Sequence, residues 1–435
     1  MDKKAKWIDR AQNLAIMVLL FSFLFLLVQT PLFGDGTGKS LSSTVRGWLR
    51  SDTLPDEAED VSLSTLSVPV RVVQSNGFVR IGSDALTTTD TAFENAAAFL
   101  GEAVGSSYGI SSASESILLS ALEGAGLYFE FSAEVPLEVL SARLGVSAPS
   151  MRAFNVHRCL LSAAEGNSVA LYLQDADGTV LRFSTAVRTS SLMEYLETLD
   201  GKSVEFACLL GEDYAFLSPY TLVFSEIGTR RELNAANALN DYPTDELLRC
   251  AGFNPHTKDW YRESTGTIVV LESQRTLYLH TDGTVEYSGT GSADANSLYA
   301  IPTVEGSTPT RTEICSAART LISSLVRGRI GDAVLFLSGM EGDSEEGYTV
   351  FFDYMVNGTP LRFSDGSHAA ELSVRGRSIT SFRLRLRRYT LSDRDSLLLP
   401  LALSRAIAQN MPGCELSIAY VDPYSDTVST SWIAD

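Results

Sequence analysis

The sequence predicts an α+β protein in which a single amino-terminal transmembrane helix precedes an extracytoplasmic, multi-domain ectodomain of helices packed on antiparallel sheets. Three observations predict this class. An uncharged stretch of 20 residues lies near the amino terminus, at residues 14–33. Turn-forming pairs such as Asn76-Gly77 and Asp282-Gly283 separate strand-like runs, as in β-hairpins. Helical stretches are followed twice by a series of such strands, an order typical of α+β domains.

The amino-terminal segment has the length and flanks of a membrane anchor. Twenty uncharged residues form a helix long enough to cross the ~30 Å hydrocarbon core of a bilayer. Residues 1–10 carry four basic and two acidic side chains, and a positive flank usually faces the cytoplasm. We therefore expect a cytoplasmic tail at 1–10, a transmembrane helix at 11–33 and an extracellular remainder, so that the protein crosses the cell membrane once. A cleaved signal peptide is the alternative, but residues 30–33 read Thr-Pro-Leu-Phe where a small-residue cleavage site would stand.

Two small residues in this segment are candidate contacts with a partner helix. Helices associate in a bilayer through close packing at small or polar residues, because lipid is as apolar as leucine. Ala15 and Ser22 lie seven residues apart and so fall on nearly the same helical face. We predict that they contribute to partner binding, with a plain anchor as the alternative reading.

The remainder divides into a linker and three predicted domains. Residues 34–66 are rich in Ser, Thr, Gly and acidic side chains, which predicts a linker. We place an amino-terminal α+β domain at 67–230, a central α+β domain at 231–300 and a carboxy-terminal domain, a helix plus an antiparallel meander, at 301–435.

Hydrophobic periodicity places the elements within these domains, since helices repeat every three to four residues and strands every two. In the first domain it predicts a hairpin at 68–81, helices at 89–104 and 114–122, a strand at 127–131, a helix at 137–144, strands at 169–173 and 180–183, a helix at 191–199, and strands at 203–209 and 220–225. In the central domain it predicts a helix at 245–251 and strands at 267–272, 275–280 and 284–287. In the last domain it predicts a helix at 312–326, strands at 333–338, 347–356, 359–364, 369–374 and 378–389, a helix at 396–408, and strands at 415–421 and 427–433.

Composition excludes several classes of function. The 435 residues include 34 Lys and Arg against 53 Asp and Glu, a net charge of −19. A chain this acidic repels phosphate backbones, so we expect no nucleic-acid partner. The five cysteines and four histidines are scattered without the spacing of a zinc site or a disulfide framework, so we predict no metal or cofactor. The sequence also lacks the common nucleophile, metalloprotease and nucleotide-binding motifs, and we expect no catalytic residues and no enzymatic activity.

One strand concentrates positive charge in this acidic chain. Residues 375–388 contain six arginines. Because alternate residues of a strand face opposite sides, Arg383, Arg385 and Arg387 are predicted to form a row on one sheet face. Such a row is able to bind an anionic polymer, a lipid headgroup or an acidic partner. The alternative is that these arginines pair with the chain's own carboxylates.

The order of several turn and core motifs resembles the YycH/YycI family. The matching segments are Gly-Phe-Asn-Pro at 252–255, Tyr261 and Glu263, Gly-Thr at 266–267, Asp-Gly-Thr-Val-Glu-Tyr at 282–287, the Phe-Asp-Tyr and Val-Asn-Gly of 352–358, and the terminal strand at 416–432. The region at 127–144 is also similar to the YycH amino-terminal region. The length of the chain favours YycH over the shorter YycI, whereas the helix at 312–326 and the arginine row have no match in the family pattern.

This resemblance implies regulation by contact. Members of the family are membrane-anchored regulators of the essential cell-wall sensor histidine kinase of Gram-positive bacteria, and they bind the kinase partly through the transmembrane helix. The resemblance therefore implies a sensor histidine kinase as partner, with a second YycH/YycI-type protein as a further candidate. The residues themselves leave another reading open, an extracellular module that binds a cell-wall or secreted ligand through the arginine-rich sheet face.

Overall fold

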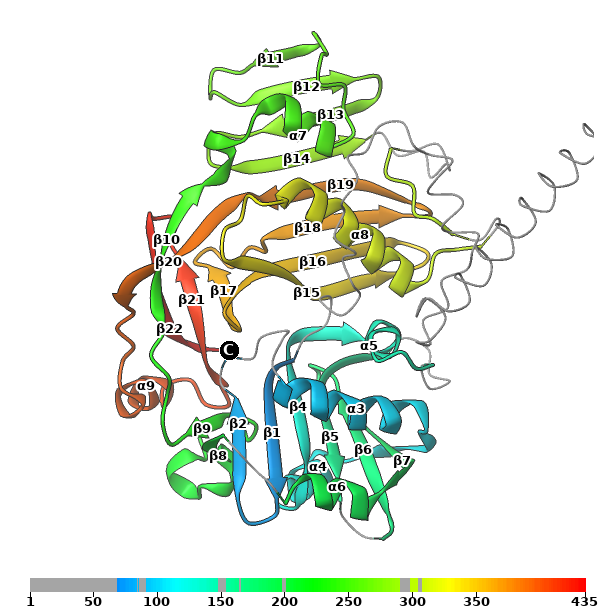
Figure 1. Ribbon diagram of the computed structural model, residues 1–435, viewed down its shortest axis with the longest axis vertical. Coiled ribbons are helices and arrows are strands. Elements are labelled where there is room, and N and C mark those ends of the chain that lie inside the picture. Colours follow the sequence, from blue (N-terminus) through cyan, green and yellow to red (C-terminus); the bar gives the residue numbers. More distant parts are fainter. Residues whose placement is uncertain are drawn as a thin grey trace, which may run out of the picture. The chain divides into compact units, whose positions relative to one another are not determined.

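The described part of the chain belongs to one compact unit, Asp60–Asp435. Its strands form two large sheets (Figure 1). The structure is a computed structural model. It describes residues 69–83, 85, 91–147, 154–163, 166–197, 201–289, 298–303 and 307–435.

The first sheet has nine antiparallel strands in the order β3-β7-β6-β5-β4-β1-β2-β8-β9. Its strands are β1 (Pro69–Asn76), β2 (Arg80–Ser83), β3 (Tyr108–Ala113), β4 (Ala125–Pro136), β5 (Asn155–Ser162), β6 (Ser168–Gln174), β7 (Val180–Arg188), β8 (Lys202–Phe206) and β9 (Leu222–Phe224). The β1–β2 hairpin turns where the sequence predicts, at Gly77, whose φ of 91° suits glycine. The side-chain oxygen of Asn76 accepts hydrogen bonds from the amides of Phe78 and Val79.

Helices cover both faces of this sheet. They are α3 (Thr91–Gly105), α4 (Glu115–Leu122), α5 (Leu137–Arg143) and α6 (Thr189–Tyr195). Leu100 of α3 and Leu140 of α5 belong to the main hydrophobic core, whereas Leu118 of α4 packs into a second cluster on β4, β8 and β9. The sheet is therefore buried on both sides, which explains the nearly continuous apolar runs in β4 and β6.

The second sheet has thirteen strands and is antiparallel except for one pair, β17 and β21. Its order is β11-β12-β13-β14-β19-β18-β16-β17-β21-β22-β10-β20, with β15 paired to β16. Its strands are β10 (Arg231–Asn237), β11 (Trp260–Arg262), β12 (Ile268–Glu272), β13 (Arg275–Leu279), β14 (Thr284–Gly289), β15 (Ala333–Asp343), β16 (Gly347–Val356), β17 (Thr359–Phe363), β18 (Ala370–Arg375), β19 (Ser378–Arg385), β20 (Arg387–Asp395), β21 (Leu416–Asp422) and β22 (Thr427–Ala434). Because β14 pairs with β19 and β10 pairs with β20, strands from the ranges 231–300 and 301–435 share this sheet.

Three helices and three short 3₁₀ turns complete the described chain. They are α7 (Thr244–Cys250), α8 (Arg311–Val326), α9 (Leu401–Ala408), η3 (Ala207–Leu209), η4 (Glu212–Tyr214) and η5 (Ala238–Asp241). Figure 1 shows α8 lying across the strands from β15 to β19. A capping box begins it, in which Thr310 accepts from the Glu313 amide and Glu313 accepts from the Thr310 amide. α8 also contacts α5, so one hydrophobic core runs from the first sheet into the second.

The structure confirms the α+β class and most predicted elements, and it corrects three of them. The strand predicted at 203–209 ends at Phe206 and is followed by η3, and the helix predicted at 396–408 begins only at Leu401. The strand predicted at 378–389 is two strands, β19 and β20, separated at Leu386. The amide of Leu386 donates to the carbonyl of Gly283 instead of continuing the ladder, at 2.9 Å. The chain thus leaves the β14–β18 part of the sheet and pairs next with β10. Strands β3, β5, β10 and β11 were not predicted.

The transmembrane segment predicted at 11–33 and the linker at 34–66 lie outside the described residues. Among the residues that the structure does describe, no helix is long and apolar enough to span a bilayer.

Candidate functional site

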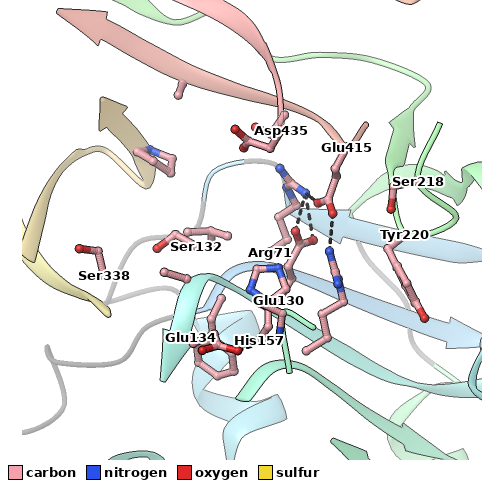
Figure 2. A pocket seen from close by; sticks show the side chains of 18 of the residues that line it. Arg71, Glu130, Ser132, Glu134, His157, Ser218, Tyr220, Ser338, Glu415 and Asp435 are labelled. Carbon is pink, nitrogen blue, oxygen red and sulfur yellow. Dashed lines mark hydrogen bonds and ion pairs between the residues drawn. The ribbon is translucent and has the colours of Figure 1, made fainter. Parts of the chain in front are cut away.

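A cavity of about 860 Å³ opens between the two sheets. The first sheet contributes β1, β4 and β5 to its wall, and the second contributes β15, β16 and the segment around β21. Figure 2 shows ionisable side chains from both sheets meeting at its centre, among them Arg71, Glu130, His157 and Glu415.

A ladder of alternating charge crosses the first sheet at this point. In the strand register, Arg71 of β1 lies opposite Glu130 of β4, Glu130 opposite Arg158 of β5, and Arg158 opposite Gln174 of β6. Side chains directly opposite in neighbouring strands point to the same face and attract when their charges differ. Nη1 of Arg71 donates to both carboxylate oxygens of Glu130, each at 2.9 Å.

Glu415 of the second sheet completes this ladder. It lies just before β21, and its Oε1 accepts from Nη1 of Arg71 at 3.0 Å. Its Oε2 pairs with Nη2 of Arg158. The side chain of each of these residues is at most 14% exposed. One carboxylate therefore joins two guanidinium groups that belong to the other sheet. We call Arg71, Glu130, Arg158 and Glu415 the charged junction.

Polar and aromatic neighbours hold Arg158 in place. Its guanidinium carbon lies 4.4 Å from the centre of the Tyr220 ring, a cation–π contact. The Tyr220 hydroxyl accepts from Gln174 at 2.9 Å and donates to Glu115 at 3.1 Å. The first-sheet side of the junction is thus held by contacts that do not involve Glu415.

The two carboxyl groups of the junction have opposite pKa shifts. Burial raises the pKa of Glu130 well above its ordinary value; the Glu415 carboxylate adds to this, although Arg71 opposes it. Burial acts to raise the pKa of Glu415 as well, but a hydrogen bond with Glu130 and the charges of Arg71 and Arg158 outweigh it and hold that pKa well below its ordinary range. Glu415 is therefore the carboxylate that balances the two guanidiniums.

His157 sits beside the junction in its neutral form. Burial, with the charge of Arg158 adding to it, lowers the pKa of His157 to about 4. Its Nδ1 is buried and has no hydrogen-bond partner among the described residues.

Glu130, His157 and Glu415 are the described residues that come closest to a metal site. Their ligand atoms lie within 4.8 Å of one another. Both carboxylates, however, face the guanidiniums of Arg71 and Arg158, so a cation would have to displace an arginine to bind there. No local sequence pattern brings these residues together, because Glu415 lies far along the chain from the other two.

Ion pairs also line the rim of the cavity. Arg362 contacts the carboxylate of Asp435 at 2.5 Å. His368 Nδ1 lies 2.9 Å from Asp353, and this hydrogen bond raises the pKa of His368 above its usual value. Both pairs are formed by residues in or next to strands of the second sheet, so these rim groups are already paired with each other.

The predicted arginine row is engaged in ion pairs as well. Burial alternates as predicted from Phe382 to Leu386, with Leu384 and Leu386 inside, but it stops alternating at Arg387. Arg383 is half exposed and lies 3.2 Å from Glu286. Arg385 lies 3.0 Å from Asp365 and is 12% exposed. Arg387 lies on β20 and is buried, and its Nε lies 2.7 Å from Oδ2 of Asp422.

These contacts are the ones expected if the arginines pair with the chain's own carboxylates. A continuous exposed row on one strand is not observed, because Arg387 is buried on a separate strand. The other two predicted partner-binding residues, Ala15 and Ser22, lie outside the described residues.

The charged junction is the feature that sequence reasoning missed. Its members are separated by up to 344 positions and form no motif. One local signal was present, a lone glutamate in the apolar run Leu-Tyr-Phe-Glu-Phe at 127–131. A charge inside a buried strand requires a partner, but the sequence does not reveal which of many distant cations supplies it.

Comparisons with known proteins give one structural likeness. No family model matches the chain, and no curated protein sequence matches it. Among solved structures the chain resembles the crystal structure of YycH from Bacillus subtilis, with a TM-score of 0.55 and 11% sequence identity. The likeness covers 86% of this chain and 94% of that one. At this identity the comparison establishes a distant YycH-like fold.

Proposed function

We propose that this protein is a membrane-anchored, extracytoplasmic regulator that binds a sensor histidine kinase controlling cell-wall metabolism and sets its activity by contact. The observation that carries the proposal is the YycH-like fold, which extends over 86% of the chain. The order of the sequence motifs described above points to the same family. The uncharged segment at 14–33 supplies the anchor that such a regulator needs.

The charged junction favours a structural role for its side chains over a catalytic one. Arg71 and Arg158 are held by Glu130 and Glu415, and these contacts join two sheets. Catalytic groups have to be available to a substrate, whereas these side chains are committed to one another. We therefore propose that the protein acts without catalysis of its own.

The structure gives less support to the alternative, a module that binds an anionic wall polymer through the arginine row. Arg385 and Arg387 are largely buried in ion pairs, and Arg383 is the most exposed of the three. Binding through this face would require most of these pairs to open.

Co-purification from membranes tests the proposal against this alternative. The full-length protein, extracted in mild detergent, is expected to retain a sensor histidine kinase. An Arg383→Ser variant is expected to retain it equally, because the proposed contact does not use the row. Retention of wall polymer without a kinase, lost on Arg383→Ser, would instead establish the alternative.

A further inference from the structure

The cavity between the two sheets has an excess of negative charge. Among the described residues, seven carboxyl side chains line it against three arginines. Two of each belong to the charged junction, and Arg362 pairs with Asp435. The other four lining carboxyl groups form no ion pair with a described residue. We call them the unpaired carboxylates: Glu115 of α4, Glu134 of β4, Asp177 of the β6–β7 turn and Glu341 of β15.

Cations close to the cavity do not cancel this excess. Arg230 and Arg311 approach the lining without joining it, and each donates to a neutral side-chain oxygen, at 3.0 Å and 2.9 Å. His368 lines the cavity and is balanced by Asp353, which is outside the lining. Even with both arginines counted, the carboxyl groups remain in the majority. A cleft lined mainly by one sign of charge concentrates ions of the opposite sign.

The hydrogen-bonding groups left over in the cavity are mainly acceptors. Each lining guanidinium already donates to a carboxylate. Glu134 accepts from the Ala176 amide at 2.8 Å and from the Asn155 side chain at 3.2 Å, which uses two of the roughly four acceptor positions of a carboxylate. Glu341 is exposed, and its carboxylate accepts from no described residue. A ligand that satisfies these groups has to bring hydrogen-bond donors.

Apolar side chains line the same cavity. From the second sheet they include Met340, Phe351, Ile418 and Trp432. Lysine and arginine show how a ligand uses such a surface, since their alkyl stems pack on apolar groups while the charged head stays with polar ones. The faces of aromatic rings also attract cations. The cavity therefore accommodates both ends of a molecule that joins an alkyl chain to a positive group.

We propose that the cavity binds an organic cation whose ammonium or guanidinium group contacts the unpaired carboxylates and whose alkyl stem packs on the apolar lining. A free amine and the Lys or Arg side chain of a peptide share this chemistry. The cavity volume of about 860 Å³ lies within the usual range for small-molecule sites. The inference goes beyond the proposed function and does not depend on it, because the site lies entirely within this chain.

Two other classes of ligand fit less well. An anion would have to separate the guanidiniums of the charged junction from their buried carboxylates, which is costly. A metal ion needs several ligand atoms close together. Among the described residues such a group is formed by Glu130, His157 and Glu415, and none of these is an unpaired carboxylate.

Titration calorimetry of the full-length protein in mild detergent tests the proposal. The probes are acetyl-Lys-Ala-Lys-amide, its neutral counterpart with norleucine in place of both lysines, and 1,5-diaminopentane as a free amine of equal charge. We expect at least one of the two cations to bind about tenfold more tightly than the norleucine peptide, the effect of one hydrogen bond to a charged group. Tighter binding of the diamine identifies a free amine as the ligand, and tighter binding of the lysine peptide identifies a peptide side chain.

Matched variants connect binding to the cavity. Glu134→Gln keeps an acceptor oxygen for the Ala176 amide, and Glu341→Gln changes an exposed side chain, so we expect both proteins to fold. Each is expected to weaken the tighter cation by about threefold or more, since each removes one attracting charge. Glu263→Gln, at an exposed carboxylate outside the lining, should leave binding unchanged.

Three results would overturn the proposal. The first is that neither cation binds, and the second is that the norleucine peptide binds as tightly as they do. The third is that the two cavity variants weaken binding no more than Glu263→Gln, because the cations would then be attracted by the overall negative charge of the chain and not by this site.

Discussion

Glu415 contacts two guanidiniums that belong to the other sheet, and both contacts are largely shielded from water. Glu415→Gln removes the charge that balances Arg71 and Arg158 and leaves cations buried without sufficient compensation. We expect the free energy of unfolding to fall by about 3 kcal/mol, as when one partner of a buried ion pair is removed. Urea unfolding followed by tryptophan fluorescence measures the loss.

The rim pair formed by Arg362 and Asp435 is the matched control. Both side chains are more than 40% exposed, so Asp435→Asn should cost less than about 1 kcal/mol. Equal losses for Glu415→Gln and Asp435→Asn would mean that the charged junction contributes no more than a surface pair.

His157 makes stability depend on pH in a defined window. Its pKa is about 4 in the folded protein, below the ordinary value of 6.5, so the unfolded chain takes up a proton first as the pH falls. Its contribution is complete above about pH 6.5 and is lost progressively toward pH 4. We expect a loss of about 2 kcal/mol between pH 7 and pH 5 from this group alone.

Comparison with His157→Gln isolates this contribution. Glu130, whose pKa is raised, contributes the opposite slope here, since its contribution falls as the pH rises above its unfolded value. The informative quantity is therefore the difference in free energy of unfolding between the two proteins at each pH. The free energy of unfolding of the unmutated protein, minus that of His157→Gln, should decrease as the pH falls from 7 to 5. A constant difference would show that His157 does not titrate as a buried neutral side chain.

At the scale of elements, the turn at Gly331 connects α8 to β15 and passes directly against β20. Its φ is +70°, and a β-carbon there would lie 2.2 Å from the carbonyl oxygen of Tyr389. The neighbouring amides tie the two segments together, with Asp332 donating to that oxygen and Tyr389 donating to Ile330. Gly331→Ala is therefore expected to cost at least about 3 kcal/mol, because backbone atoms would have to separate.

Gly366→Ala controls for backbone conformation alone. Gly366 has a similar φ of +74°, but no atom lies within 4 Å of the position a β-carbon would take. We expect a cost of about 1 kcal/mol there, measured by thermal unfolding of both variants. If Gly331→Ala costs no more than Gly366→Ala, the close approach of the two backbones is not as described.

The elements that were predicted correctly have strong local patterns. The β1–β2 hairpin has an Asn-Gly turn, and α8 has a capping box followed by an apolar face. The missed strand β10 has the sequence Arg-Glu-Leu-Asn-Ala-Ala-Asn, which contains little to favour a strand. It becomes a strand because β20 and β22, both distant in sequence, pair with its two edges.

The candidate site was beyond local prediction for the same reason. Arg71 and Arg158 are two of many arginines, and their pairing with Glu415 exists only once both sheets have formed. The arginine row was predictable as an alternation of burial along the strand, but the break at Leu386 and the ion pairs to Glu286, Asp365 and Asp422 depend on tertiary structure.

At the scale of the whole molecule, the proposed topology places residues 1–10 inside the cell and 34–435 outside. Protease added to intact cells or protoplasts should digest the extracellular part and leave a small membrane-held fragment, because the basic flank and uncharged segment fix the orientation. Immunoblotting with antibodies against each end measures the outcome. A full-length chain that stays protected, or a mature protein that begins near residue 34, would overturn this topology.

The proposed regulation predicts that kinase activity responds to this protein in the same membrane. The most direct measurement is the autophosphorylation rate of the cell-wall sensor histidine kinase of the same organism, reconstituted in proteoliposomes with and without the full-length protein. We expect the rate to change at least threefold, roughly a 0.7 kcal/mol shift in the balance between kinase states, and the two proteins to co-purify. An unchanged rate with the protein in excess, together with no co-purification, would contradict the account.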